Sequence, residues 1–360
     1  MAPHSNDSPS PAREFSTDFN MSFHPPINSV LRESSNENSI YSVNESSYSS
    51  SYSSVSTEAD DHMARPLVPG VYVPTVCFFD PTTEELDTET ISSHAIRLAK
   101  AGVTGLATQG SNGEAVNLTH AERQTVTATT RAALTSAGFP HLPIIVGCGA
   151  QSVRETVQYC REAFAAGGDY ALILPPSYYA PLFLPSSASV IEYFTTVADQ
   201  SPIPLLIYNY PGAVSGIDLS SDVIIKLSAH PNVVGVKLTC GNTGKLNRIV
   251  AATRTSKPHS PASPSFLVLG GSADFTLQSL IGVVMGSSRG KIKEAQRLQE
   301  VVAQGDWAAI QGGIVSTKAG MESWLGYGGY GRAPLPHPTS DEMTKWKEGF
   351  RELVNLEKSL

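Results

Sequence analysis

Residues 203–239 read IPLLIYNYPGAVSGIDLSSDVIIKLSAHPNVVGVKLT, and this stretch decides the fold class. It holds two short apolar runs, Ile203–Tyr208 and Val233–Lys237, separated by a segment that reads as a helix. Neither run alternates apolar with polar residues, which is typical of parallel strands that are covered on both faces. The stretch therefore predicts two parallel strands joined by a helical crossover.

The same pattern occurs along most of the chain. Five further apolar runs are Gly70–Val76, Thr104–Ala107, Leu142–Val146, Tyr170–Leu174 and Phe266–Leu269. Helices are expected between them, and both Thr119-His-Ala-Glu122 and Ser152-Val-Arg-Glu155 match the capping-box pattern of a helix start. Seven such units favour an α/β fold of the (β/α)8 TIM-barrel type over an open doubly wound sheet. No G-x-G-x-x-G follows the first run, which also disfavours a dinucleotide-binding fold.

The 360 residues divide by composition into three parts. Residues 1–64 contain 18 serines, nine acids and two bases, so they carry −7 of the formal net charge of −8. Their sparse apolar residues predict a disordered tail. We expect the barrel over residues 65–305 and a C-terminal helical region over 306–360.

Charge and cysteine content narrow the class of protein. An acidic chain with a near-neutral body is a poor nucleic-acid or anionic-membrane binder. Cys77, Cys148, Cys160 and Cys240 form no C-x-x-C pair and predict free thiols. No apolar run is long enough to span a membrane. The acidic tail lacks the arginine-rich character of a mitochondrial presequence, so a cytoplasmic protein is expected.

Candidate site residues are those that follow the apolar runs, because the site of such a barrel lies at the carboxyl ends of its strands. Lys237 closes VVGVK, and a lysine amine there can attack a carbonyl; the alternative is a lysine that turns outward. Tyr208 closes IPLLIY and can relay a proton or simply anchor a turn. Gly110-Ser-Asn-Gly-Glu114 can cradle an anion or form an ordinary turn. The paired tyrosines of Pro175-Pro-Ser-Tyr-Tyr179 suit packing as well as catalysis.

Several ordered motifs together resemble the pyruvate-dependent class I aldolases, the family of dihydrodipicolinate synthase, N-acetylneuraminate lyase and 4-hydroxy-2-oxoglutarate aldolase. The resemblance covers roughly Pro69 to Pro336. Its motifs are GSNGE at 110–114, PPSYY at 175–179, YNYPG at 208–212, GVKLT at 235–239, LGGSADF at 269–275 and YGGYGRAPLP at 327–336.

The resemblance implies a role for each matching residue. Lys237 matches the lysine that forms a Schiff base with the substrate ketone. Tyr208 matches the tyrosine that relays protons, and Tyr178 matches the tyrosine that extends this relay, in many members across a subunit contact. The substrate-binding positions that match are Ser111 and Asn112, which would hold the pyruvate carboxylate, together with Thr239 and Gly271. No cofactor and no metal is implied, and the oligomer expected by analogy is a dimer or tetramer.

The motifs also bear on the substrate, a small 2-oxo acid. Dihydrodipicolinate synthases carry an arginine shortly after the YN-x-P tyrosine, where this chain has Ala213 and Val214. GSNGE, HPNVVGVK and YGGYGRAPLP look closer to 4-hydroxy-2-oxoglutarate aldolase, which releases pyruvate and glyoxylate. A dihydrodipicolinate synthase-type activity and an aldolase of 2-keto-3-deoxy sugar acids remain the alternatives.

The resemblance weakens after the seventh apolar run. Only Gly282–Met285 could form an eighth strand, and the helix that should follow it is short by at least its first half. The eighth βα unit is therefore expected to be truncated or abnormal. Three interpretations remain: a chain that has lost a segment, a rebuilt and closed barrel, and a catalytically silent barrel that acts as a subunit or binding protein.

Overall fold

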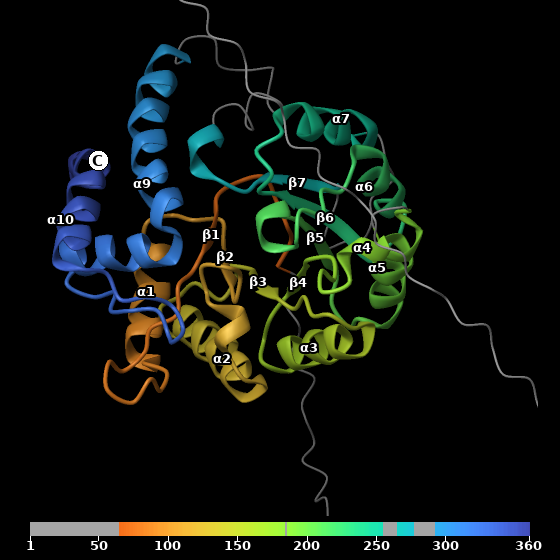
Figure 1. Cartoon of the computed structure of the whole chain (residues 1–360), viewed down its shortest axis with the longest axis horizontal. Helices are drawn as coiled ribbons and strands as arrows, with labels where there is room; N and C mark the ends of the chain where they lie inside the picture. The colour runs from red at the N-terminus through yellow and green to blue at the C-terminus, as the bar shows by residue number, and fades with distance from the viewer. Residues whose placement is uncertain (1–64, 184–185, 255–264, 277–291) are drawn as a thin grey trace, which may run out of the picture. The chain divides into compact units, whose positions relative to one another are not determined.

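The computed structural model describes residues 65–183, 186–254, 265–276 and 292–360, which belong to one compact unit (Figure 1). The predicted tail, residues 1–64, lies outside this part of the chain. So does Gly282–Met285, the candidate eighth strand.

A parallel sheet of seven strands forms the centre of the described structure. The strands pair in the order of the sequence, from β1 to β7, and every pair is parallel. Each predicted apolar run overlaps one of them: β1 (Tyr72–Pro74), β2 (Gly105–Thr108), β3 (Ile144–Gly147), β4 (Tyr170–Ile173), β5 (Leu205–Asn209), β6 (Val233–Leu238) and β7 (Leu267–Gly270). The predicted parallel strands are confirmed as the described part of a barrel.

Helices alternate with these strands and lie around the outside of the sheet (Figure 1). They are α1 (Thr88–Lys100), α2 (His120–Ser136), α3 (Val153–Ala165), α4 (Ala180–Phe183), α5 (Ala188–Gln200), α6 (Ser221–Leu227) and α7 (Thr243–Thr253). Three short 3-10 helices follow strands: η1 (Ala115–Asn117), η2 (Pro211–Ala213) and η3 (Ala273–Phe275). The capping box predicted at Thr119 is complete, and at Ser152 the hydroxyl accepts the amide of Glu155.

The alternation of side chains along each strand divides the apolar core in two. One large cluster lies between sheet and helices and includes Val236 and Leu238 of β6. A second cluster, which includes Leu206 and Tyr208 of β5, lies on the inner face of the sheet. Because successive side chains of a strand point to opposite faces, Lys237 points to the inner face.

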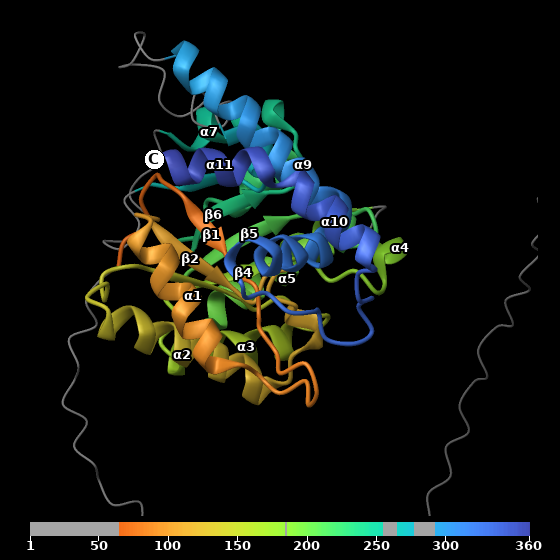
Figure 2. The ribbon, with the colours of Figure 1, turned by 90° about the vertical axis from the view of Figure 1, so that its left-hand side faces the viewer.

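Three helices complete the described chain (Figure 2). They are α9 (Ile292–Leu325), α10 (Ser340–Gly349) and α11 (Arg351–Ser359). The predicted boundary at residue 305 falls inside α9. This helix bends at Gly313, whose φ of 57° and ψ of −135° are not helical, and its second half, with α10 and α11, packs near α1.

Two smaller expectations can be compared with the described residues. All four cysteines are free thiols, and three of them, Cys77, Cys148 and Cys160, are buried. No helix in the described ranges is long and apolar enough to cross a membrane.

One buried histidine gives the fold a testable pH dependence. His94 of α1 is 6 % exposed, packs against Phe78, and has its Nδ1 3.2 Å from the hydroxyl of Tyr327. Burial, and secondarily the positive charge of Arg97, lowers the pKa of His94 to about 4.

We predict that the free energy of unfolding falls by about 2 kcal/mol between about pH 7.5 and about pH 5 on account of His94. The unfolded histidine takes up its proton near pH 6.5 and the folded one only near pH 4, so acidification in this window favours unfolding. Urea unfolding at both pH values measures the effect. His94→Phe should remove this part of the pH dependence, and a change at the exposed His141, His141→Phe, should not. An equal drop in wild type and His94→Phe would contradict the account.

Candidate active site

The register of β5 and β6 brings together the two candidate residues with the clearest chemistry. Tyr208 pairs directly with Lys237, one residue before the end of each strand. The ammonium nitrogen of Lys237 lies 4.4 Å from the centre of the Tyr208 ring. Tyr208 is 4 % exposed, whereas Lys237 is only half-buried. A lysine amine and a phenol are thus neighbours on the inner face of the sheet, at its carboxyl edge.

Thr239 and Gly271 lie beside this pair. The amide of Thr239 donates to the carbonyl of Asn209 at 3.0 Å, which extends the β5–β6 pairing beyond the strand ends. Its Oγ1 is buried and has no hydrogen-bond partner within the described ranges. A Cβ at Gly271 would lie 2.0 Å from this Oγ1, so only glycine fits there. The two predicted binding residues are therefore close neighbours, and the Thr239 hydroxyl is a buried polar group without a partner among the described residues.

The loop after β2 carries the two other predicted binding residues. Ser111 is exposed and Asn112 is half-buried. Among the contacts of the described residues, neither their side chains nor their backbone amides donate a hydrogen bond. The loop closes on itself through bonds from the amides of Gly113 and Ala115 to the carbonyl of Gly110. Free N–H groups, a hydroxyl and an amide at a strand end are the donors expected of a small anion cradle.

This loop begins and ends at strained residues. Gln109 has a φ of 55° and Glu114 a φ of 51°, in the left-handed region that non-glycine residues rarely adopt. Such a conformation costs on the order of 1–3 kcal/mol per residue and persists only where surrounding contacts enforce it. The side chains of both residues are buried and fully engaged, and they supply those contacts.

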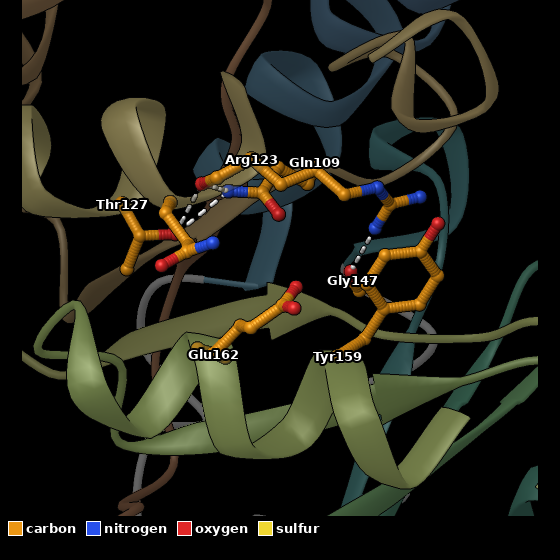
Figure 3. Close-up of a pocket in the computed structure, with 8 residues that line it drawn as sticks. Gln109, Arg123, Thr127, Gly147, Tyr159 and Glu162 are labelled. Carbon is orange, nitrogen blue, oxygen red and sulfur yellow. Dashed lines mark hydrogen bonds between the residues drawn. The ribbon is translucent and has the colours of Figure 1, made fainter. Parts of the chain in front are cut away.

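Gln109 is held by α2 (Figure 3). Its side-chain amide donates to the carbonyl of Arg123 and to the Thr127 hydroxyl, both at 2.6 Å. Arg123 in turn donates to the carbonyl of Gly147 at 2.9 Å, and its guanidinium stacks over the ring of Tyr159 at 4.1 Å. These contacts tie the loop to the end of β3 and to α3.

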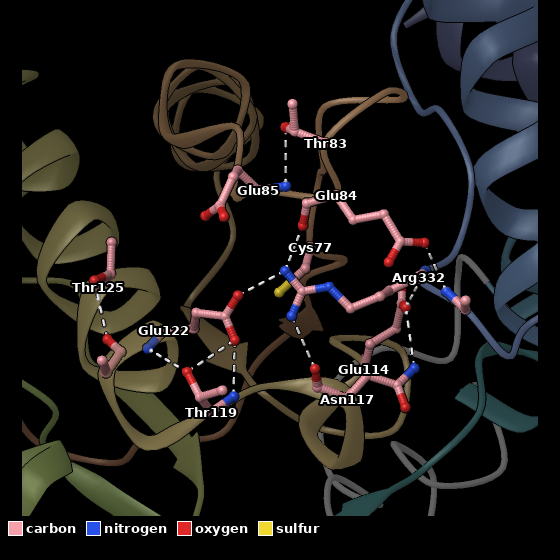
Figure 4. A network of polar contacts seen from close by, with 12 residues as sticks. Cys77, Thr83, Glu84, Glu85, Glu114, Asn117, Thr119, Glu122, Thr125 and Arg332 are labelled. Carbon is pink, nitrogen blue, oxygen red and sulfur yellow. Dashed lines mark hydrogen bonds and ion pairs between the residues drawn. The ribbon is translucent and has the colours of Figure 1, made fainter.

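Glu114 is held by the C-terminal part of the chain (Figure 4). Its Oε1 accepts from the ammonium of Lys318 at 2.6 Å, with both side chains 1 % exposed. Its Oε2 accepts from the backbone amide of Arg332 at 2.8 Å. Burial lowers the pKa of Lys318, and the charge of Glu114 opposes that shift. A buried charge of this kind is tolerated only when it is paired.

The Arg332 guanidinium and the Cys77 thiol lie near this ion pair. The Arg332 guanidinium donates to Glu122 at 2.6 Å and to the carbonyl of Asn117 at 2.9 Å. The bond to Arg332 lowers the pKa of Glu122 to about 2. Burial raises the pKa of the Cys77 thiol to about 12, so this thiol stays neutral and donates to the carbonyl of Gly113 at 3.2 Å.

Tyr178 differs from the other predicted catalytic residues because its side chain lies in solvent. It follows β4 at the same edge of the sheet, but its side chain is 78 % exposed. Its amide donates to the Gln151 side chain at 2.9 Å, and its ring packs edge-on against Tyr179. The structure therefore leaves Tyr178 apart from the pair formed by Lys237 and Tyr208.

A second polar network fixes the end of β5. Asn209, next to Tyr208, is fully buried and donates to Asp218 at 2.8 Å. The same carboxylate pairs with Lys245, which is 3 % exposed. Asn209 also accepts the amide of Leu219 at 2.9 Å. The asparagine of the YNYPG motif thus holds the backbone that carries Tyr208.

Two cavities lie apart from Lys237. One, of about 10 Å³, lies between α2 and α3 beside Arg123 and is too small for a 2-oxo acid (Figure 3). The other, of about 140 Å³, is lined mainly by α9 and α11, including Met321, Trp324 and Phe350. In the described ranges no group of three or more His, Cys, Asp or Glu could hold a metal ion.

Sequence reasoning missed the residues that hold the loop. Glu114 and Arg332 lie inside two of the motifs, GSNGE and YGGYGRAPLP, and their place in these motifs could have indicated a role. Lys318 gave none, because a lysine within a helix ordinarily lies at the surface.

A parallel α/β sheet with a lysine and a tyrosine side by side at its carboxyl edge has the layout of an enzyme whose site lies at the strand ends. The comparisons with known proteins agree: the model of the dihydrodipicolinate synthetase family matches residues 68–312. The chain belongs to this family, and it is an aldolase, a carbon–carbon lyase.

Three similar proteins illustrate the relationship. "Probable 4-hydroxy-2-oxoglutarate aldolase, mitochondrial" of Emericella nidulans is 52% identical over 82% of this chain and 98% of its own. "L-threo-3-deoxy-hexylosonate aldolase" of Aspergillus niger is 45% identical over 82% of this chain and 98% of its own. The crystal structure of a dihydrodipicolinate synthase family protein from Coccidioides immitis is 31% identical, with a TM-score of 0.69 over 82% of this chain and 99% of that one.

Proposed function

We propose that this aldolase is a class I enzyme that cleaves a 4-hydroxylated 2-oxo acid to pyruvate and an aldehyde through a Schiff base on Lys237. The observation that carries the proposal is the pairing of Lys237 with Tyr208 at the carboxyl edge of the sheet. It combines a nucleophilic amine with a proton donor and acceptor in one place.

The reaction can be written with these two groups. The amine of Lys237 attacks the C2 ketone, and loss of water gives an iminium. Tyr208 gives its phenolic proton to the departing water and then takes the proton of the C4 hydroxyl; the C3–C4 bond breaks, and its electron pair moves into the iminium to form an enamine. The aldehyde leaves, C3 is protonated, and water releases pyruvate and the free amine. Neither metal nor cofactor enters these steps.

The binding groups have roles in the same scheme. Ser111, Asn112 and their free amides would hold the carboxylate, and Thr239, beside Gly271, would contact the substrate near the ketone. Tyr178 would join the proton relay only if a second subunit or a loop shift covers it. That requirement supports a homo-oligomer, a dimer or tetramer, as part of the proposal.

We propose 4-hydroxy-2-oxoglutarate as the substrate, supported by the relative that is 52% identical. A deoxy sugar acid is the second candidate: it is supported by the relative that is 45% identical, and by Ala213 and Val214, which offer no charge to the second carboxylate that a sugar acid lacks. We keep the cytoplasm as the proposed compartment. The names of two relatives contain the word mitochondrial, which makes mitochondria the alternative. The chemistry is the same in either compartment.

The Schiff base predicts a covalent product. Incubation with pyruvate and borohydride should leave a reduced pyruvate group on Lys237, read by peptide mass spectrometry. Lys237→Ala should lose it, whereas a change at the exposed Lys226, Lys226→Ala, should keep it. Wild-type protein that folds cooperatively but gains no adduct would refute the mechanism and favour a silent barrel.

The substrate assignment predicts an order of kcat/KM values. We expect 4-hydroxy-2-oxoglutarate first and L-threo-3-deoxy-hexylosonate second. Condensation of pyruvate with aspartate semialdehyde should come last, because the relatives that are 52% and 45% identical are named for the other two substrates. Pyruvate release coupled to a dehydrogenase measures the cleavages. A sugar acid that exceeds 4-hydroxy-2-oxoglutarate tenfold or more, on the order of 1.4 kcal/mol, would overturn the assignment.

A further inference from the structure

We propose that Glu114, Lys318 and Arg332 are positioning residues through which the C-terminal part of the chain sets how tightly the loop 109–114 holds the substrate carboxylate. The inference rests on the proposed function, because it takes this loop as the carboxylate site. It adds to that function a set of residues that never touch the substrate.

The backbone of the loop 109–114 is strained at both ends. Its free amides, those of Ser111 and Asn112, lie between two non-glycine residues in the left-handed region, Gln109 and Glu114. The chain is anchored on both sides of Glu114, by the bond from its amide to the carbonyl of Ser111 (3.2 Å) and by the bond from the Asn117 amide to its carbonyl (2.8 Å), so a change in its φ and ψ has to be taken up by the loop. The direction of the donors therefore depends on Glu114.

Glu114 is held by residues that are distant from it in sequence. At the Gln109 end, every partner comes from residues near the loop in sequence. The principal partners of Glu114 come from far away: the Lys318 ammonium, from the second half of α9, and the Arg332 backbone amide. Lys318 is itself tied by a second bond, 2.7 Å to the carbonyl of Tyr330. The Glu114 side chain is thus 1 % exposed and is held by residues of the C-terminal part, of which Figure 4 shows Arg332.

The positive charges of Lys318 and Arg332 are both compensated by carboxylates. Lys318 is paired with Glu114, and the Arg332 guanidinium is paired with Glu122. Both cations are engaged by carboxylates, so neither offers an uncompensated charge to a bound anion. The network therefore acts on carboxylate binding through the direction of the loop amides. A substrate analogue that lacks the carboxylate charge should be much less sensitive to it.

The test compares two ketones on one protein. The double variant Glu114→Gln/Lys318→Met removes both charges together and leaves neither buried alone. The rate of borohydride-trapped adduct formation is measured with pyruvate and with its methyl ester, and backbone hydrogen exchange of the loop is measured by mass spectrometry. Taking the ratio of the two rates cancels any change in the amount of folded protein or in the reactivity of Lys237.

A matched control pair lies at the opposite end of the sheet. Arg131 and Asp169 form an ion pair at 2.5 Å, and Asp169 accepts the amide of Ile144 where β3 begins. Arg131→Met/Asp169→Asn should destabilise the fold while leaving the preference for pyruvate over the ester unchanged. In Glu114→Gln/Lys318→Met we expect this preference to fall at least about tenfold and the loop to exchange faster.

Three results would overturn or redirect the inference. A folded double variant with the wild-type preference, or with wild-type exchange in the loop, overturns it. If the double variant does not fold, the milder Glu114→Asp decides, because it keeps the charge but shortens the reach to the Lys318 ammonium and the Arg332 amide: a lowered preference supports the inference, and an unchanged one refutes it. If wild type forms no adduct with either ketone, the proposed function fails, and loop exchange alone then decides whether Glu114 and Lys318 position the loop.

Discussion

The parallel pairing of β5 with β6 is the constraint on which the site depends. In this register Tyr208 lies opposite Lys237, and both point to the inner face, while Val236 and Leu238 pack under the helices. A shift of one residue would turn Lys237 into the apolar layer between sheet and helices and expose its neighbours, which is energetically costly. The large outer core therefore fixes the direction of the lysine. Asn209 adds to this, because its bonds to Asp218 and Leu219 hold the backbone directly after Tyr208.

A second constraint joins the loop after β2 to the second half of α9. The loop after β2 is strained at Gln109 and Glu114, and the strain at Glu114 is offset by a buried ion pair with Lys318. Buried ion pairs contribute little net stability, but the loss of one partner is strongly destabilising. This makes the pair better suited to specifying one geometry than to adding stability. The bend of α9 at Gly313 separates a first half of the helix from the half that delivers Lys318.

The sequence predicted the parts of the structure that rest on local patterns. Each of the seven apolar runs overlaps a strand, because unbroken β-branched runs between helices have few other solutions. The adjacency of Lys237 and Tyr208 also followed, since consecutive parallel strands align their carboxyl ends. The Glu114–Lys318 pair could not be found this way, because 204 positions separate its members and no periodicity links them. The exposure of Tyr178 was equally invisible: a tyrosine after a strand can face inward or outward, and only tertiary packing decides. Whether an eighth strand forms at Gly282–Met285 is a question about residues outside the described ranges.

The central claim is that Lys237 carries the substrate while the loop 110–113 holds its carboxylate. A crystal structure of the protein after reaction with pyruvate and borohydride tests both halves at once. The account predicts continuous density from the Lys237 Nζ to C2 of the reduced pyruvate, with the carboxylate against the Ser111 and Asn112 amides and the Tyr208 hydroxyl close to the new bond. Density for the adduct on any other lysine, or a carboxylate directed away from this loop, would contradict it.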